Sequence, residues 1–261
     1  MKLSIITVCF NAEKTIEKTF QSVLDQNINS NIEHLIIDGA SKDQTLVLAK
    51  AYQEKSPYPV KIFSEPDKGL YDAMNKGIQK AAGEFIHFLN ADDVYAGNDV
   101  LSLIKPYLKG PSVFYGNTVF KEDDGCVIRR GGVIGSQEER RWPMKVHQPA
   151  LFVPKQLYQK GGLFNLKYKI AADFEMTLRL RDEAEFKYID LDIVRMDPGG
   201  LSDRQALRGL KECLDIAHTR GRSKVLNGLD YYFWMLPKHK IKKSFPGFFK
   251  FVRQIIRKNK I

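Results

Sequence analysis

Four aspartates that follow short apolar runs are the residues of this chain best suited to chemistry. Asp38, Asp67 and the adjacent pair Asp92-Asp93 each come after a run rich in β-branched and other apolar residues. Paired carboxylates supply the hard oxygen ligands that suit Mg²⁺ or Mn²⁺ shared with a diphosphate. A metal held in this way neutralises charge that develops on a phosphate leaving group. Two aspartates after a strand also form turns or cap a helix, so this competing explanation stays open on the pattern alone.

The elements that position these carboxylates alternate between strands and helices. Apolar runs predict strands at 3–10, 32–37, 60–63 and 84–89, and helical spacing predicts helices at 16–24, 43–52 and 70–81. Strands that alternate with helices imply right-handed crossovers and a parallel sheet. Ligands of such sheets bind in the crevice beyond the carboxyl ends of the strands. We therefore expect an α/β fold with one crevice that is lined by Asn11, Asp38, Asp67 and Asp92-Asp93.

The pattern is looser after Asp93. It predicts a helix at 100–108, strands at 112–120, 126–129, 150–153 and 189–196, a hairpin turn at 122–125, and helices at 174–180 and 204–235. With no repeat and no low-complexity linker, we expect one catalytic domain at 1–205 and a helical extension at 206–261. Within the domain, 1–95 is the predicted nucleotide-binding half and 96–205 the predicted acceptor half.

Composition and motifs exclude several classes of protein. The 261 residues are 43% apolar and 28% charged, which is ordinary for a globular protein. No Gly-rich dinucleotide or P-loop motif and no G-x-S-x-G elbow is present, so Rossmann dehydrogenases, P-loop enzymes and α/β-hydrolases are excluded. Three dispersed cysteines indicate a reducing compartment without disulfides or a Cys-based zinc site. We see no signal peptide and no apolar run long enough to span a membrane, so we expect a cytoplasmic protein.

Four motifs in order resemble the family 2 glycosyltransferases, most of all the bacterial branch that builds exopolysaccharide, such as the colanic acid transferases. The motifs are Ser4–Asn11, Ile37–Thr45, Ser64–Gly77 and Phe88–Asp93, and weaker matches continue at His147-Gln148, Ala172-Asp173-Phe174 and Gly199-Gly200-Leu201-Ser202. The resemblance implies a GT-A fold, which is a mostly parallel sheet flanked by helices. It also implies a nucleotide diphosphate sugar, here a UDP-sugar, as the donor.

The resemblance implies a donor site at the ends of the first four strands. Phe10 is expected to stack on uracil, and Asp38 is expected to accept a hydrogen bond from the ring N–H. Further contacts to the nucleotide are expected from Asn11, Asp67, Gly69 and Asp92, with Gly69 letting the backbone approach closely. For the metal, Mn²⁺ or Mg²⁺, the implied ligands are Asp93 and Asp92. Asn90 stands where the family's metal motif has its first Asp.

The resemblance also implies Asp173 as the catalytic base. The family has a Glu-Asp pair at the start of a helix, and here the pair is Ala172-Asp173. Inversion at the anomeric carbon needs a base that takes the acceptor hydroxyl proton as the diphosphate leaves. A role for Asp173 as the helix N-cap is the competing explanation. His147 and Gln148 are placed on the acceptor side, although a lone histidine is more often a structural hydrogen-bonding group.

We expect an inverting, non-processive glycosyltransferase of cell-surface polysaccharide biosynthesis. Residues 137–142 resemble the Q-x-x-R-W motif of processive synthases, but they contain one residue too many and precede Asp173. One rival is a sugar-1-phosphate nucleotidyltransferase, whose Gly-rich basic loop after the first strand is absent here. The other rival is a degenerate nucleotide- or glycan-binding module, which Asn90 and Ala172 motivate.

The net charge of +10 is concentrated at the C-terminus. Nine basic residues and no acidic one lie in 237–261, so the rest of the chain is nearly neutral. Residues 246–260 place apolar side chains at helical spacing among these charges, as in helices that lie on anionic membranes. Packing of that helix on the domain is an alternative, and we expect no nucleic-acid partner. A membrane surface bound through 238–261 suits an acceptor that is a saccharide or a polyprenyl-diphosphate-linked glycan. The expected location is the cytoplasmic face of the inner membrane.

Overall fold

The computed structural model of the 261-residue chain describes residues 3–27, 31–121, 127–133, 146–197, 200 and 204–220. By its internal contacts the chain divides into two compact units, Met1–Ala206 and Leu207–Ile261, which we describe separately. The predicted turn at 122–125, the segment 137–142, most of 199–202 and the basic tail at 238–261 lie outside the described residues.

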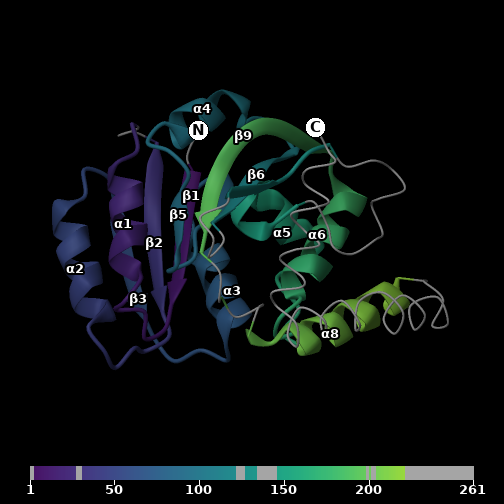
Figure 1. The fold of residues 1–261 in the computed structure, drawn as a ribbon, viewed down its shortest axis with the longest axis horizontal. Helices are drawn as coiled ribbons and strands as arrows, with labels where there is room; N and C mark the ends of the chain where they lie inside the picture. The colour runs from purple at the N-terminus through teal and green to yellow at the C-terminus, as the bar shows by residue number, and fades with distance from the viewer. Residues whose placement is uncertain are drawn as a thin grey trace. The chain divides into compact units, whose positions relative to one another are not determined.

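The first half of the sheet follows the predicted strand–helix alternation (Figure 1). Its strands pair in the order β3-β2-β1-β4, and all three pairs are parallel. The strands are β1 (Leu3–Cys9), β2 (Ile32–Asp38), β3 (Val60–Ser64) and β4 (Phe85–Phe88). The helices between them are α1 (Ile16–Leu24), α2 (Thr45–Lys55) and α3 (Leu70–Lys80).

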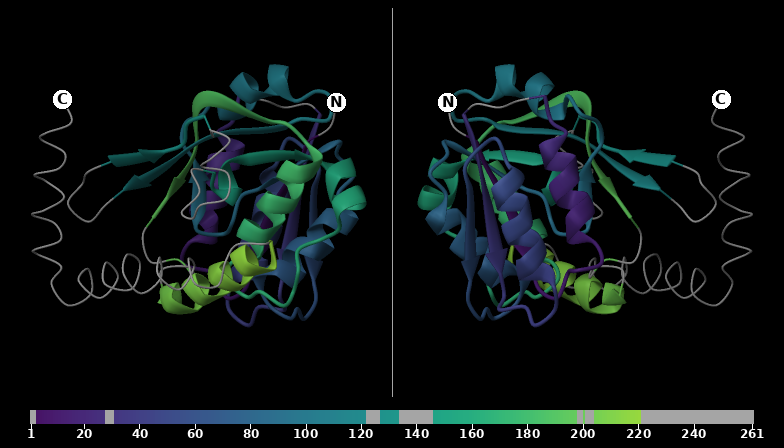
Figure 2. Two further views of the ribbon diagram at one scale, coloured as in Figure 1. Left: turned by 90° about the vertical axis from the view of Figure 1, so that its right-hand side faces the viewer. Right: turned by 90° about the vertical axis from the view of Figure 1, so that its left-hand side faces the viewer.

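The second half makes the sheet mixed rather than mostly parallel. The sheet continues from β4 in the order β8-β6-β9-β5, and β7 pairs with β6. Among these pairs only β6 and β9 run parallel. Parallel neighbours need a crossover long enough to return the chain to its starting edge, whereas β6 and β7, which are close in sequence, pair antiparallel (Figure 2). The strands are β5 (Asp93–Tyr95), β6 (Val113–Lys121), β7 (Val127–Arg130), β8 (Leu151–Pro154) and β9 (Phe186–Met196).

The helices of this half include one that the sequence did not predict, α5 (Lys155–Gly161). The predicted helix at 100–108 is an α-helix, α4 (Val100–Ile104), that tightens into the 3-10 turn η1 (Lys105–Tyr107). A second 3-10 turn, η3 (Gln148–Ala150), precedes β8, and α6 (Ala172–Glu183) carries Asp173. In the second unit the structure describes α8 (Ala206–Thr219). Among the described residues no helix is both long and apolar enough to cross a membrane.

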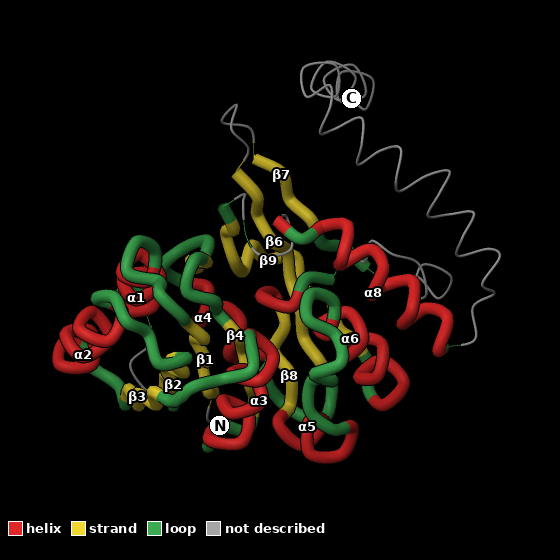
Figure 3. Tube along the Cα trace, turned by 90° about the horizontal axis from the view of Figure 1, so that it is seen from below, coloured by secondary structure: helices red, strands yellow, loops and turns green. Residues whose placement is uncertain are grey.

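Two layers of helices cover the sheet (Figure 3). Helices α1, α2 and α4 share one face, where their buried side chains join a single core with Ile5, Ile36 and Phe152. Helices α3, α5 and α6 cover the other face. Gly77 lets α3 lie close to the strands, because a Cβ at this position would come within 2.6 Å of Ile6 Cγ2. The carboxyl ends of β1–β4 remain uncovered by these helices and carry the loops of the site.

A chain of buried hydrogen bonds holds His34 between β1 and α2. Thr7 Oγ1 donates to the Leu89 carbonyl at 2.7 Å, so it accepts from His34 Nε2 at 2.8 Å. His34 Nδ1 then accepts from the Tyr52 hydroxyl at 2.7 Å. Burial lowers the pKa of His34 to about 3 and that of His87 to about 4, so both are neutral near pH 7.

These histidines make stability depend on pH. Below pH 6.5 the unfolded chain binds protons that folded His34 and His87 do not, so the free energy of unfolding falls as the pH drops toward 4. We expect each histidine to contribute about 1.4 kcal/mol per pH unit over this range. Urea unfolding at pH 7, 6 and 5 measures how steeply the free energy of unfolding changes with pH. In His87→Phe or His34→Gln this slope should correspond to one fewer proton bound on unfolding. Equal slopes in wild type and both variants would contradict this origin.

Candidate active site

The loops after β1, β2 and β3 meet around Gly39. A Cβ on Gly39 would overlap the carboxylate of Asp67 and lie 3.3 Å from Phe10 Cδ2. Phe10 is 60% exposed although it directly follows a buried strand, so its ring is not part of the core. An open aromatic ring next to a carboxylate, with only backbone between them, is a surface onto which a planar base can stack and hydrogen-bond.

Asp38 is fully buried at the end of β2, with an exposed fraction of 0%. Its Oδ1 accepts from the Ser41 hydroxyl at 2.5 Å, and its Oδ2 accepts from Ser41 N at 3.0 Å and from the Ser64 hydroxyl at 2.7 Å. Buried carboxylates are retained where such bonds satisfy them. The carboxylate therefore ties the end of β2 to the end of β3 in this structure, while its predicted contact with the base stays a prediction.

Asn11 also joins two loops of the site. Its backbone has a positive φ of 49°, a conformation that asparagine tolerates better than most residues. Its N–H donates to Ser41 Oγ at 2.8 Å, and its side-chain Oδ1 accepts from Lys42 N at 2.9 Å. Asn11 thus fixes the loop that presents Phe10 against the loop that presents Gly39.

The loop after β3 is braced by the helix that follows it. Asp67 Oδ1 accepts from Gly69 N at 2.8 Å, and Gly69 has a φ of 115° that only glycine adopts without strain. No atom lies within 4 Å of a Cβ built on Gly69, so its conformation, not a close approach, requires glycine here. From α3, Asp72 Oδ2 accepts from Lys68 N at 2.9 Å and Lys76 Nζ donates to the carbonyl of residue 66 at 2.7 Å.

Asp92 and Asp93 lie in opposite environments at the start of β5. Asp93 is 2% exposed, and its Oδ2 accepts from Asn90 Nδ2 at 3.1 Å. Its carbonyl also accepts from Thr19 Oγ1 at 2.8 Å. Asp92 is exposed. An ion arriving from solvent would therefore meet Asp92 first, while the role of Asp93 as the main metal ligand stays a prediction.

A third carboxylate, Asp197, acts on this pair. The antiparallel register of β5 and β9 pairs Asp93 with Met196 and so sets Asp197 beside Asp92. Burial and the negative charge of Asp92 raise the pKa of Asp93 well above its usual value. The pKa of Asp92 is also raised, by desolvation and by Asp197, whereas Arg204 opposes that rise. Negative potential therefore gathers at this end of the sheet.

The donor set at Asp92 fits a divalent cation of the Mg²⁺ or Mn²⁺ type. The Asn90 Oδ1 atom is buried and makes no hydrogen bond within the part of the chain that the structure describes. This amide oxygen and the Asp92 carboxylate are oxygen ligands of the kind that these ions prefer. In the same part of the chain, no three His, Cys, Asp or Glu side chains are grouped closely enough to hold an ion. Such a site suits an ion that completes its coordination with phosphate and water.

Asp173 is the second residue of α6 and is not its N-cap. The N-cap is Ala171, and no side chain caps this helix end. Asp173 Oδ1 accepts from the Tyr71 hydroxyl at 3.0 Å and from Phe174 N at 2.8 Å. Its side chain is half-buried. Because Tyr71 lies two residues after Gly69, this bond links the predicted base to the loop that carries Asp67.

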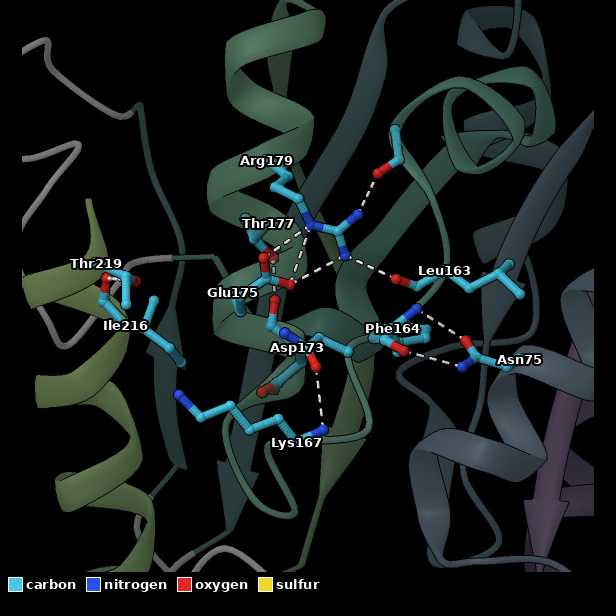
Figure 4. Close-up of polar contacts among 12 residues, drawn as sticks. Asn75, Leu163, Phe164, Lys167, Asp173, Glu175, Thr177, Arg179, Ile216 and Thr219 are labelled. Carbon is cyan, nitrogen blue, oxygen red and sulfur yellow. Dashed lines mark hydrogen bonds and ion pairs between the residues drawn. The ribbon is translucent and has the colours of Figure 1, made fainter.

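The segment before α6 is held from two sides (Figure 4). Asn75 of α3 accepts from Phe164 N at 2.8 Å and donates to the Phe164 carbonyl at 3.0 Å, so it braces this segment against α3. Arg179 pairs with Glu175 at 2.8 Å and donates to the carbonyls of Gly161 and, at 2.7 Å, of Leu163. The start of α6 therefore has a fixed position relative to α3.

His147 and Gln148 lie at η3, beside the end of β6. Burial and the charge of Arg130 lower the pKa of His147 to about 4, so its ring is neutral near pH 7. The ring meets Phe120 edge-on with centroids 5.3 Å apart, and its buried Nδ1 has no hydrogen-bond partner among the described residues. Gln148 is 8% exposed. An acceptor role for the two residues stays a prediction.

Comparison with known proteins identifies the family of this chain. The family model described as glycosyl transferase family 2 matches residues 4–163. An uncharacterised glycosyltransferase of Mycobacterium tuberculosis is 34% identical over 181 residues, which are 68% of each chain. The chain is a member of glycosyltransferase family 2.

Solved glycosyltransferases share the GT-A fold of this family 2 member. The structure of S. aureus TarS 1-349 in complex with UDP-GlcNAc matches 89% of this chain and 73% of that chain, with a TM-score of 0.69 and 17% identity. The mannosyltransferase PcManGT from Pyrobaculum calidifontis, in complex with GDP-Man and Mn²⁺, has a TM-score of 0.67 and 16% identity over 89% of this chain and 70% of that chain. This glycosyltransferase spans 46% of a longer TarS chain.

Two residues of the site escaped the sequence analysis. Tyr71 carries a bond to the predicted base, and Asp197 lies beside Asp92. The i, i+4 spacing of Tyr71 with Asn75 was a usable signal, because such a pair lies on one face of a helix. The sequence around Asp197 contains no signal of this kind, because only the pairing of β5 with β9 brings Asp197 to the site.

Proposed function

We propose that this family 2 glycosyltransferase transfers one sugar from a UDP-sugar to a saccharide or lipid-linked glycan, with inversion at the anomeric carbon. The bond between Tyr71 and Asp173 carries the proposal, because it ties a candidate base to the helix that begins at the nucleotide loop. The S. aureus TarS structures bind UDP and UDP-GlcNAc, which supports a uridine nucleotide.

Each step of the reaction is assigned to residues of this chain. Phe10 stacks on the base and Asp67 contacts the nucleotide, while Asn11 and Asp38 hold their loops in place. Asp173 accepts the proton of the acceptor hydroxyl as that oxygen attacks the anomeric carbon. Asp92 and Asn90 would hold a divalent ion, which neutralises charge on the departing diphosphate. The Mn²⁺ in the PcManGT complex supports such an ion.

The setting of the reaction rests on sequence. The resemblance to exopolysaccharide transferases supports a polyprenyl-diphosphate-linked acceptor in cell-surface polysaccharide biosynthesis. The basic residues of 238–261 support peripheral binding to the cytoplasmic face of an anionic inner membrane. Sedimentation with phosphatidylglycerol vesicles tests the second point, with phosphatidylcholine vesicles as the control.

A panel of nucleotide sugars with Mn²⁺ tests the reaction itself. Thermal shift identifies the donor, because a ligand that binds only the folded state raises the melting temperature. UDP release in the presence of glycan acceptors then reports transfer. A nucleotidyltransferase would instead form pyrophosphate from UTP and a sugar 1-phosphate. Nucleotide binding without turnover of any donor–acceptor pair would favour a degenerate binding module.

The exposed ring of Phe10 gives a prediction for donor binding. Loss of stacking on a base costs about 1–3 kcal/mol. We therefore expect Phe10→Ala to weaken UDP binding about 5- to 150-fold in a calorimetric titration. Val47→Ala on α2 is the control, because Val47 is also 60% exposed but lies outside the loops of the site. Equal UDP affinity in wild type and Phe10→Ala would exclude stacking on this ring.

A further inference from the structure

We infer that Tyr71 is a positioning residue for the catalytic base, holding the Asp173 carboxylate in place and favouring its ionised form. The inference rests on the proposed function, because it takes Asp173 as the base. It assigns to the first turn of α3 a role in the chemistry that is separate from donor binding.

Tyr71 itself has little freedom to move. The residue is 5% exposed, and its ring lies 5.4 Å from the ring of Phe164. Its hydroxyl lies 2.8 Å from the carbonyl of Ile170 and 3.0 Å from Asp173 Oδ1, so one O–H is shared between two acceptors. The Tyr71 hydroxyl therefore holds both the backbone just before α6 and the carboxylate of Asp173.

Helix α3 presents two pairs of side chains, each spaced i, i+4. Asp72 and Lys76 hold the backbone of the loop that carries Asp67. Tyr71 and Asn75 hold the segment from Phe164 to Asp173. Residues spaced by four lie on the same face of a helix, so each pair acts as one clamp. Helix α3 therefore fixes Asp173 relative to the loop that carries Asp67.

The bond has a chemical consequence besides its geometry. A hydrogen bond donated to a carboxylate stabilises the ionised form, which is the form that accepts a proton. It also fixes the plane of the carboxylate, so that the acceptor hydroxyl meets the base in one orientation. Loss of the donor should therefore slow the chemical step and leave donor affinity intact.

The first test is Tyr71→Phe, which keeps the ring and removes the hydroxyl. We expect kcat to fall about 10- to 100-fold, the range for a lost hydrogen bond to a charged group, with KM for the donor unchanged. We also expect the acid limb of the rate profile to move to higher pH. Tyr52→Phe is the matched control, because it removes a buried hydroxyl with two hydrogen bonds, to His34 and Tyr58, and should leave kcat unchanged.

The second test is a double-mutant cycle with Asp173→Asn. If Tyr71 acts through Asp173, Tyr71→Phe adds no further loss in the Asp173→Asn background, whereas a general packing defect adds in full. Additive losses, or wild-type kcat in Tyr71→Phe alone, would overturn the inference and leave the proposed function standing. Full activity in Asp173→Asn would instead remove the base assignment itself.

If Tyr71→Phe fails to fold, 3-fluorotyrosine at position 71 replaces it as the test. The fluorinated hydroxyl is a stronger hydrogen-bond donor, so it should shift the acid limb of the rate profile to lower pH. An unshifted acid limb would count against the inference.

Discussion

Replacement of Asp173 by asparagine is expected to lower the rate of sugar transfer about 100- to 10,000-fold, the usual contribution of a general base. Asparagine has nearly the same shape and can still accept from Tyr71, but it cannot take up the acceptor proton. Because Phe10 and Asp67, the residues proposed to contact the nucleotide, lie in other loops and are unchanged, UDP affinity should be retained. Rates of UDP release and calorimetric UDP affinity, measured on the same preparation, check both halves of the expectation.

The matched control lies on the same helix. Glu183 is the last residue of α6 and pairs with Lys160 at the surface, an interaction of little energetic weight. Glu183→Gln should therefore transfer sugar at the wild-type rate. If Asp173→Asn and Glu183→Gln behaved alike, the assignment of Asp173 as the base would be wrong.

Replacement of Asp92 by asparagine is also expected to lower the rate of sugar transfer strongly. We expect transfer to fall about 100- to 1,000-fold, because the proposed ion, which would stabilise the leaving diphosphate, would lose its charged protein ligand. Activity alone does not identify a metal ligand, so binding is the sharper measurement. In wild type, Mn²⁺ should tighten UDP binding, and in Asp92→Asn this dependence on Mn²⁺ should be lost.

Two further variants make the test selective. Asp99→Asn removes an exposed charge a few residues after β5 and should leave Mn²⁺-dependent binding intact. Asp93→Asn replaces a buried carboxylate and should mainly lower the free energy of unfolding. If Asp93→Asn abolished the Mn²⁺ dependence while Asp92→Asn preserved it, Asp93 would be the ligand, as the sequence alone predicts.

The first half of the fold was predictable because β1, β2 and β4 are buried along their whole length. Mostly apolar runs of this kind have a clear signal, and the helices between the strands favour parallel pairing. Strand β5 was missed because it has three residues and begins with an aspartate. Helix α5 was missed because only Leu157 and Tyr158 are buried on it, which gives no sustained period.

The sequence predicted aspartates of the candidate site, but it did not predict which of them are buried and which are exposed. Asp38 and Asp67 both follow strands, yet the hydroxyls of Ser41 and Ser64 enclose only the first. Asp92 and Asp93 are adjacent in the chain, but alternation along β5 directs Asp93 inward. Such differences depend on the neighbouring strands, which sequence periodicity does not specify.

The anomeric configuration of the product tests the central claim most directly. An acceptor oxygen activated by Asp173 attacks from the face opposite the departing diphosphate, so one displacement inverts the anomeric carbon. With an α-linked UDP-sugar donor, proton NMR of the first product formed should show a β-glycosidic linkage. An α-linked product from the same donor would contradict direct displacement and the role that we propose for Asp173.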